Sequence, residues 1–408
     1  MTSTMNRFSR PIASLTAAIR HAHPPKATRA YTSGGENAKN SKKTQRSNGK
    51  VAMTQIRVDG QSDNKVKIKG HSLLHGQRPR RSFLYVPAHS QRFLEKALKS
   101  AADCIVLDLE DGVAPSQKAA ARENIKHLLG RLAEEGYKTG ENKGAELCIR
   151  VNHEGWLTQK RWACGPGGEI AAPSKELDQD LDLFAIPGTF KLPLTIVAPK
   201  ITTPYDLRNL RTVIINKRKP LDTDFKFTNK ITLIPTIETA AAVLNLPIFP
   251  AHVKYFSAMV FASEDYCASM GIPRTKDYSN MLFARSNLVH VCKAVGVSPI
   301  DMVCQDFKDL EVLKRECEEG VHLGFEGKQA IHPDQIETIN KVFSPSAEQV
   351  EWAKALLEAV EKNTTNGAFE FEGKMVDRPV FRQAETIVTK HQLIEDFEKN
   401  RFVTEVAF

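Results

Sequence analysis

Eight short apolar runs, each separated from the next by a longer stretch, recur between residues 83 and 331. The apolar runs have the length of buried parallel strands, and most of the stretches between them are amphipathic and helix-like. Eight strands alternating with helices, at roughly the 250-residue size of that fold, predict a closed (β/α)₈ or TIM barrel. An open doubly wound sheet is disfavoured because its usual Gly-rich dinucleotide fingerprint is missing from the sequence. The predicted strands cover residues 83–87, 104–109, 146–151, 195–199, 231–237, 255–262, 299–304 and 327–331.

Charged or polar side chains follow nearly every predicted strand. In a barrel, active-site groups gather where the parallel strands end, so this pattern predicts a single polar mouth. Each residue could instead be a loop charge or a helix cap, the interpretation we favour for Lys200 or Asp306 taken alone. The residues at successive strand ends are Glu110 and Asp111, Arg150 and Asn152, Lys200, Glu238, Glu264 and Asp265, Asp301 or Asp306, and His332.

Two of these acids suggest a metal site. Glu238 and Asp265 each follow a predicted strand, and they are 27 residues apart, which is the spacing of consecutive strands in a βαβ repeat. They could therefore meet on one hard cation such as Mg²⁺. Mn²⁺ would also suit a site with oxygen ligands. The alternative is that each acid simply begins a loop or caps the next helix.

The N-terminal segment does not resemble a folded domain. The first 35 residues contain no Asp or Glu, while Arg and Lys recur among Ser, Thr and Ala. This is the composition of a mitochondrial transit peptide, so we expect a matrix protein. The segment ending at Tyr31 resembles a mitochondrial processing site, which predicts a transit peptide over residues 1–31 and a disordered linker over 32–76. A disordered basic tail without a targeting role is the alternative.

Charge, hydropathy and cysteine usage exclude several classes of protein. Removing residues 1–31 would lower the formal net charge from +9 to +4, and the basic run at 40–46 has no aromatic residue for base stacking. No apolar run reaches the roughly 18 residues of a membrane span. The seven cysteines are scattered and form no CxxC pair, as expected of reduced thiols. We therefore expect neither a nucleic-acid nor a membrane partner.

Two further segments lie outside the strand and helix repeat. Residues 153–180 form a Gly-rich stretch that is longer than an ordinary loop, which suggests a lid over the mouth. After the barrel domain, predicted over residues 77–343, residues 346–363 predict another helix and a glycine-containing turn falls at 372–374. Residues 344–408 are thus expected to form an arm that packs on the barrel or on a neighbouring subunit.

A series of motifs along the chain resembles one enzyme family. The motifs are RRSFLYVP at 80–87, VLDLEDGV at 106–113, IRVN at 149–152, APK at 198–200, PTIET at 235–239, SED at 263–265, GKQAIHP at 327–333 and GKMVDRP at 373–379. In this order they resemble the citrate lyase β-subunit group of the HpcH/HpaI aldolase family, over about residues 78–390. The last two are most similar to its citrate lyase β-like, citramalyl-CoA lyase branch.

The resemblance implies a Mg²⁺-dependent barrel that cleaves or forms a carbon–carbon bond in a β-hydroxyacyl-CoA. It implies that Glu238 and Asp265 are the metal ligands and that Arg150 holds the keto-acid oxygens. Asp377 matches the catalytic acid or base, which reaches an adjacent subunit's site from the C-terminal arm. That arrangement implies a homo-oligomer, expected to be a trimer. Without the resemblance, Asp377 would be interpreted as a turn residue before Pro379.

Other positions match substrate contacts of the family. By the resemblance, Tyr85, Arg92 and Lys96 would meet the CoA part, and Ile300 and Asp301 would contact the substrate. The alternatives are a core aromatic for Tyr85 and solvated charges on one helix face for Arg92 and Lys96.

The expected reaction is cleavage of citramalyl-CoA to pyruvate and acetyl-CoA, with malyl-CoA, citryl-CoA or the reverse condensation as alternatives. An aldolase acting on a free keto-acid adduct and a catalytically silent CoA-binding subunit also remain open. One departure from the family lies near the substrate, since the usual Pro-Gly-Asn after the first strand is Pro87-Ala88-His89 here. The acyl-group specificity therefore depends on more than the shared motifs.

Overall fold

The chain divides into two units, Met1–Val66 and Lys67–Phe408. Every residue described below belongs to the second unit. The predicted transit peptide 1–31, the predicted linker 32–76 and residues 155–172 of the predicted lid lie outside the described residues. The computed structural model describes residues 78–135, 144–154, 173–186, 192, 194–218, 232–362 and 367–402.

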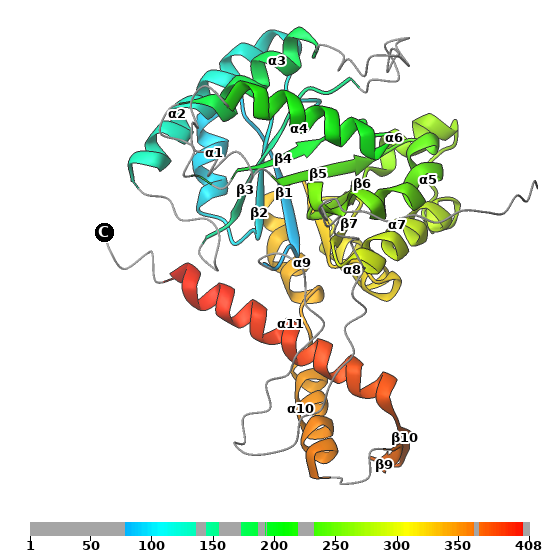
Figure 1. The fold of residues 1–408 in the computed structure, drawn as a ribbon. Helices are drawn as coiled ribbons and strands as arrows, with labels where there is room; N and C mark the ends of the chain where they lie inside the picture. The colour runs from blue at the N-terminus through cyan, green and yellow to red at the C-terminus, as the bar shows by residue number, and fades with distance from the viewer. Residues whose placement is uncertain are drawn as a thin grey trace, which may run out of the picture. The chain divides into compact units, whose positions relative to one another are not determined.

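Eight parallel strands form a closed barrel in the order β1 to β8 (Figure 1). β1 pairs with β2 on one side and with β8 on the other, which closes the sheet. All eight predicted strands are confirmed. β6 is shorter than predicted because residues up to Tyr255 belong to a 3₁₀ helix. The strands are β1 (Ser82–Pro87), β2 (Cys104–Asp108), β3 (Glu146–Arg150), β4 (Thr195–Ala198), β5 (Thr232–Ile237), β6 (Ala258–Phe261), β7 (Ser298–Asp301) and β8 (Gly327–Ala330).

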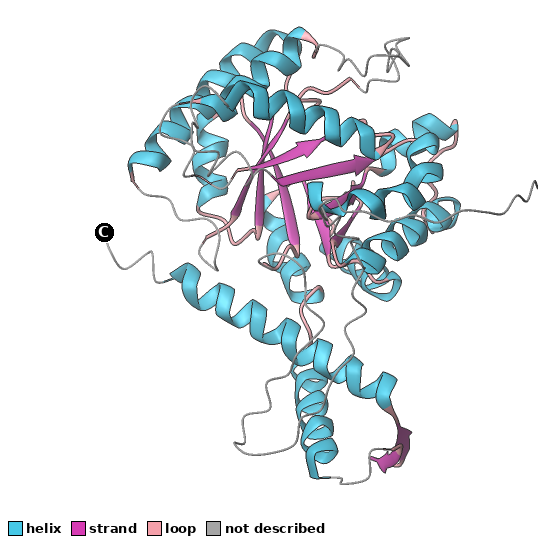
Figure 2. Cartoon of the chain, viewed as in Figure 1, coloured by secondary structure: helices cyan, strands magenta, loops and turns pink. Residues whose placement is uncertain are grey.

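Helices lie outside the strands (Figure 2). The helix-like stretches that were predicted between most of the strands are confirmed as helices. The barrel helices are α1 (Gln91–Leu98), α2 (Lys118–Glu134), α3 (Lys175–Leu181), α4 (Pro204–Arg218), α5 (Ala240–Asn245), α6 (Ser263–Met270), α7 (Leu282–Val295), α8 (Leu310–Leu323) and α9 (Ile336–Val342). Among the described residues, no helix combines the length and the hydropathy needed to cross a membrane.

The core has two layers, one on each face of the barrel sheet. In β2, Val106 belongs to the cluster inside the barrel, while Ile105 and Leu107 belong to the larger cluster under the helices. Successive strand residues point to opposite faces, and here both faces are buried. This explains why the strands appear in the sequence as continuous apolar runs rather than as alternating patterns.

The predicted C-terminal arm is confirmed as a helical arm. It consists of α10 (Ala347–Lys362), the hairpin of β9 (Phe369–Phe371) and β10 (Lys374–Val376), and α11 (Arg378–Phe402). α10 and α11 pack on each other around a separate small core that includes Leu356 and Ala384. The hairpin turns at Glu372 and Gly373, whose φ values of +51° and +73° are typical of a tight two-residue turn.

Candidate active site

Arg150, the last residue of β3, is held at the end of the barrel where the strands finish, which we call the mouth. Its Nε and Nη2 donate to Asp108 Oδ1 and Oδ2 at 2.7 and 2.6 Å, and Asp108 ends the neighbouring strand β2. The guanidinium lies over the ring of Tyr85, 4.7 Å from its centroid. A planar guanidinium fixed by two parallel hydrogen bonds has a defined orientation. Arg150 is therefore positioned before any ligand arrives.

Glu110 connects Arg150 to the other side of the mouth. Its Oε2 lies 3.1 Å from Arg150 Nη1, and its Oε1 accepts a hydrogen bond of 2.7 Å from Lys200 Nζ. Only 5% of the Glu110 side chain is exposed. Burial raises the pKa of this carboxyl above its ordinary value, although Arg150 and Lys200 oppose the shift.

Glu238, directly after β5, is a buried carboxyl for which the described residues provide no ion pair. Its Oε2 accepts from the Thr236 hydroxyl at 2.7 Å, whereas its buried Oε1 has no hydrogen-bond partner among the described residues. Burial, together with the negative charges of Glu110 and Asp265, raises its pKa to about 8 against the Thr236 hydrogen bond and the charge of Lys200. A buried oxygen in this condition costs free energy unless a ligand satisfies it.

Asp265 lies in the first turn of α6 and faces the same acids. Burial and then the charge of Asp111 raise the pKa of Asp265, while Lys200 and Arg150 lower it. Within the described residues, no group of three or more His, Cys, Asp and Glu side chains is arranged to hold a metal ion. The two carboxylates Glu238 and Asp265 nonetheless fit a hard cation, because both lack an adequate counter-charge and Glu238 has an unpartnered oxygen.

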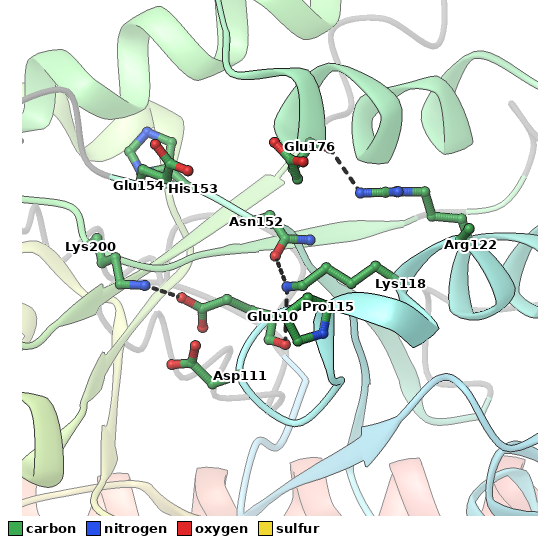
Figure 3. A pocket seen from close by; sticks show the side chains of 11 residues that line it. Glu110, Asp111, Pro115, Lys118, Arg122, Asn152, His153, Glu154, Glu176 and Lys200 are labelled. Carbon is green, nitrogen blue, oxygen red and sulfur yellow. Dashed lines mark hydrogen bonds and ion pairs between the residues drawn. The ribbon is translucent and has the colours of Figure 1, made fainter. Parts of the chain in front are cut away.

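A polar pocket of about 410 Å³ adjoins the mouth, bounded by the ends of β2, β3 and β4 and by α2 and α3 (Figure 3). Lys118 Nζ donates to the carbonyls of Leu109 and Glu110 and to Asn152 Oδ1, which ties its wall together. The pocket shares Glu110, Asp111 and Lys200 with the mouth. Its lining residues are Glu110, Asp111, Pro115, Lys118, Ala119, Arg122, Asn152, His153, Glu154, Glu176 and Lys200.

The 153–180 stretch is anchored at its C-terminal end. Asp180 is fully buried and accepts from Arg122 Nε and from the backbone N–H of Asn152, both at 2.6 Å. Leu177 of α3 is buried in the core below it. The residues from 173 to 180 therefore pack on the barrel, and the lid prediction concerns only residues 155–172, outside the described part.

The structure brings four of the sequence-predicted site residues together, namely Tyr85, Arg150, Glu238 and Asp265. Burial raises the pKa of Tyr85, and the charges that act on its hydroxyl include those of Arg150 and Glu238. These residues come from β1, β3, the end of β5 and α6, so only barrel closure makes them neighbours.

The other predicted substrate contacts lie elsewhere in the single chain. Arg92 and Lys96 are on the exposed face of α1, beyond the end of β1. Ile300 is fully buried inside the barrel. Asp301 is also fully buried, and its carboxylate is bound by Arg285 of α7 at 2.8 and 3.1 Å. Their roles in substrate binding stay predictions.

Asp377 is exposed and lies between β10 and α11, far from the mouth of its own chain. α11 contacts the barrel where Glu398 pairs with Arg81 at 2.9 Å, and Arg81 precedes β1 at the opposite end of the barrel. Asp377 comes 21 residues before Glu398, a span of about 30 Å along a helix. Among the described residues, no hydrogen bond or ion pair joins Asp377 to Arg150 or Glu238, so its catalytic role stays a prediction.

Sequence reasoning assigned no role to Asp108 or Asp180. Asp108 carried a usable signal, because an acid at the end of a buried apolar strand requires a partner. Asp180 carried none, since it falls in a Gly-rich stretch and its partners are 28 and 58 residues away.

Comparison with known proteins agrees with this geometry. The chain is 33% identical to the mitochondrial citramalyl-CoA lyase of Rattus norvegicus over 332 residues, which cover 78% of this chain and 89% of that protein. It is 30% identical to a (3S)-malyl-CoA thioesterase of Cereibacter sphaeroides, over 80% of this chain and 99% of that protein. Both of these relatives are named for CoA-thioester substrates.

The chain is also similar to a solved structure. The CitE protein of Mycobacterium tuberculosis in complex with magnesium, acetoacetate and coenzyme A superposes with a TM-score of 0.56 at 26% identity, covering 77% of this chain and 98% of that one. The sequence matches the family described as HpcH/HpaI aldolase/citrate lyase over residues 81–162 and 178–333. The chain therefore belongs to the HpcH/HpaI aldolase/citrate lyase family.

Proposed function

We propose that this protein is a Mg²⁺-dependent carbon–carbon lyase that cleaves a β-hydroxyacyl-CoA thioester or forms it in the reverse direction. The observation that carries the proposal is the buried Oε1 of Glu238, which has no hydrogen-bond partner among the described residues, at the same barrel mouth as an arginine already fixed by Asp108. A site that buries a carboxylate without a partner and holds a guanidinium in a fixed orientation is suited to bind a cation and an anionic substrate.

Glu238 and Asp265 would hold the cation. It would supply Lewis-acid stabilisation to oxygen atoms of the keto acid as the carbon–carbon bond breaks. Mn²⁺ would suit the same oxygen ligands.

Arg150 would bind the keto-acid oxygens and offset their negative charge. A guanidinium has five N–H groups, of which three face Asp108 and Glu110, so donors remain for a ligand. Because Asp108 and Tyr85 already fix its orientation, little reorganisation is needed when charge develops.

Asp377 of a neighbouring subunit would transfer the proton to or from the carbon atom of acetyl-CoA that reacts. Cleavage leaves acetyl-CoA as an enolate that must gain a proton at carbon, and a positioned carboxyl group can supply it. Support for a contribution from another subunit comes from the exposed position of Asp377 at the far end of α11. A homotrimer in which each arm completes the next site is the assembly we propose.

The CoA half would lie beyond Tyr85, along the face of α1 that carries Arg92 and Lys96. These two cations are exposed and near the mouth end of β1, where a phosphate-rich ligand could reach them. Ile300 and Asp301 could contact the substrate only through backbone atoms at the end of β7, because both side chains are fully buried.

Citramalyl-CoA, split into pyruvate and acetyl-CoA, is the preferred substrate in our proposal. The relative from Rattus norvegicus, named for that reaction and for mitochondria, supports both this choice and a matrix location. Another relative is named as a (3S)-malyl-CoA thioesterase, so malyl-CoA is also included in the test. The competing hypotheses are cleavage of citryl-CoA, cleavage of a free keto-acid adduct, and a silent subunit that only binds CoA.

The test is release of acetyl-CoA from citramalyl-CoA and malyl-CoA by the full chain, with Mg²⁺ and with EDTA. We expect metal-dependent cleavage that Asp265→Ala abolishes and that Asp377→Ala lowers by about 10²–10⁴-fold. Full activity in EDTA or in either variant would contradict the assigned roles. Mixing Asp265→Ala with Asp377→Ala subunits should restore part of the activity, because some sites then combine intact residues from both chains.

A further inference from the structure

Lys200, two residues past the end of β4, has a backbone conformation that residues with side chains rarely adopt. Its φ of +55° lies in the left-handed region. The flanking chain imposes it, because His153 Nδ1 bonds the Pro199 carbonyl at 2.9 Å and Asp206 accepts from the Thr202 N–H at 3.0 Å. A backbone outlier fixed in this way is characteristic of functional positions.

Lys200 lines the pocket that adjoins the mouth, and its ammonium meets Glu110 there (Figure 3). Nζ donates to Glu110 Oε1 at 2.7 Å, and 39% of the side chain remains exposed. The other oxygen of Glu110 faces Arg150 Nη1 at 3.1 Å. Lys200 and Arg150 therefore bind the two oxygens of one buried carboxylate, and both side chains stay partly exposed, 39% for Lys200 and 18% for Arg150.

The other cations that line the pocket are already engaged. Lys118 has an acceptor for each of its three N–H groups, and Arg122 is paired with the fully buried Asp180. For Lys200, the described part of the chain provides one hydrogen-bond acceptor, Glu110. Since an ammonium has three N–H groups, Lys200 keeps two for a ligand.

We propose that Lys200 is a substrate-binding residue that, with Arg150, holds the carboxylate of the keto-acid half of the substrate. This inference rests on the proposed function. The mouth contains the acids Glu110, Glu238 and Asp265, so an anionic group can enter only where cations with free donors face it. Lys200 helps to balance the charge of Glu110, but charge balance alone does not require a strained backbone, a partly exposed side chain and two donors left for a ligand.

The test is calorimetric titration of the full chain, in Mg²⁺, with pyruvate and with pyruvamide, its uncharged analogue. Lys200→Met should weaken pyruvate binding by about ten- to hundredfold, the usual range for a lost hydrogen bond between charged groups. Pyruvamide binding should change little, because it lacks the carboxylate. Lys200→Arg should recover part of the pyruvate affinity, since it keeps the charge.

Two comparison variants separate binding from structure. Lys293→Met removes a lysine of similar exposure that pairs with Glu326 away from the mouth, and it should leave pyruvate binding unchanged. Lys200→Gly should lose as much pyruvate affinity as Lys200→Met. Its melting temperature should be higher than that of Lys200→Met, because glycine adopts the left-handed backbone conformation without strain. Equal weakening of pyruvate and pyruvamide, or no weakening, would overturn the proposal, as would a wild-type chain that binds neither compound.

This outcome is separable from that of the proposed function. If the wild-type chain cleaves no CoA thioester but binds pyruvate through Lys200, the lyase proposal fails and this inference stands. If thioesters are cleaved and pyruvate binding is indifferent to Lys200, the inference fails and the lyase proposal stands.

Discussion

Two glutamates of the same barrel, Glu146 and Glu238, are equally buried, at 4% exposure each, yet have opposite electrostatics. Glu146 begins β3, at the end of the barrel opposite the mouth. Burial would raise its pKa, but Arg80, bonded at 2.6 Å, together with Arg78 and the Thr195 hydroxyl, lowers it to about 2. Glu238 follows β5 at the mouth, and burial raises its pKa to about 8.

The difference shows how the two ends of one barrel divide their tasks. At the end where the strands begin, buried charges meet close partners, as in the Arg81–Asp103 pair at 2.8 Å. At the mouth, Glu238 and Asp265 gather without enough positive charge. In this fold the first end serves stability and the second serves ligands, and the charge distribution agrees with that rule.

The largest expected effect comes from exchanging each glutamate for its neutral isostere. Glu146→Gln should lower the free energy of unfolding by about 3–5 kcal/mol, because Arg80 then remains buried without its counter-charge. Glu238→Gln should not lower it in the absence of a divalent cation, because burial already disfavours the ionised form of this carboxyl and raises its pKa to about 8. Denaturant unfolding of both variants in EDTA tests this, and equal losses would remove the distinction between the two ends.

The pH dependence of stability sharpens the comparison, because the two groups act in opposite directions. The folded pKa of Glu238, about 8, lies above the usual 4.5, so its protonated form is favoured by folding. Its ionisation should reduce stability as pH rises between those values, by at most about 1.4 kcal/mol per pH unit. The folded pKa of Glu146, about 2, is depressed, so its contribution is present above pH 4.5 and is lost as pH falls toward 2.

Melting temperatures in EDTA between pH 6 and 8.5 measure the Glu238 effect. Glu238→Gln should flatten the wild-type decline, and Mg²⁺ should offset it in the wild-type chain at the high-pH end, where the carboxylate is ionised. A decline that persists in the variant would assign the effect to other groups.

The sequence predicted the barrel because both faces of its strands are buried, which leaves uninterrupted apolar runs. It predicted Arg150, Glu238 and Asp265 as neighbours because strand ends meet at one rim. It could not reveal the importance of Lys200, whose strained backbone and Glu110 partner, 90 residues away, appear only in the folded chain.

The alternation of side chains along a strand explains why the motif alone does not give the orientation of Asp301. Ile300 points inside the barrel, so the next residue, Asp301, must point toward the helices, where Arg285 binds it. A strand-end acid can therefore face away from the mouth, and motif spacing alone does not show which residues do so.

The smallest expected effect concerns the two ion pairs of Arg81, at the end of the barrel opposite the mouth. Arg81 pairs with Asp103, whose side chain is fully buried, and with Glu398 of α11, whose side chain is 49% exposed. Glu398→Gln should cost no more than about 1 kcal/mol, because water screens an exposed partner. Asp103→Asn is the matched control and should cost about 3–5 kcal/mol, because it leaves the buried Arg81 guanidinium without its main counter-charge. Denaturant unfolding measures the free energy of unfolding of both variants. If Glu398→Gln lowers it as much as Asp103→Asn does, the contact of α11 with the barrel contributes as much to stability as the buried ion pair. In that event, loosening α11 should also lower turnover, since the same helix begins directly after Asp377.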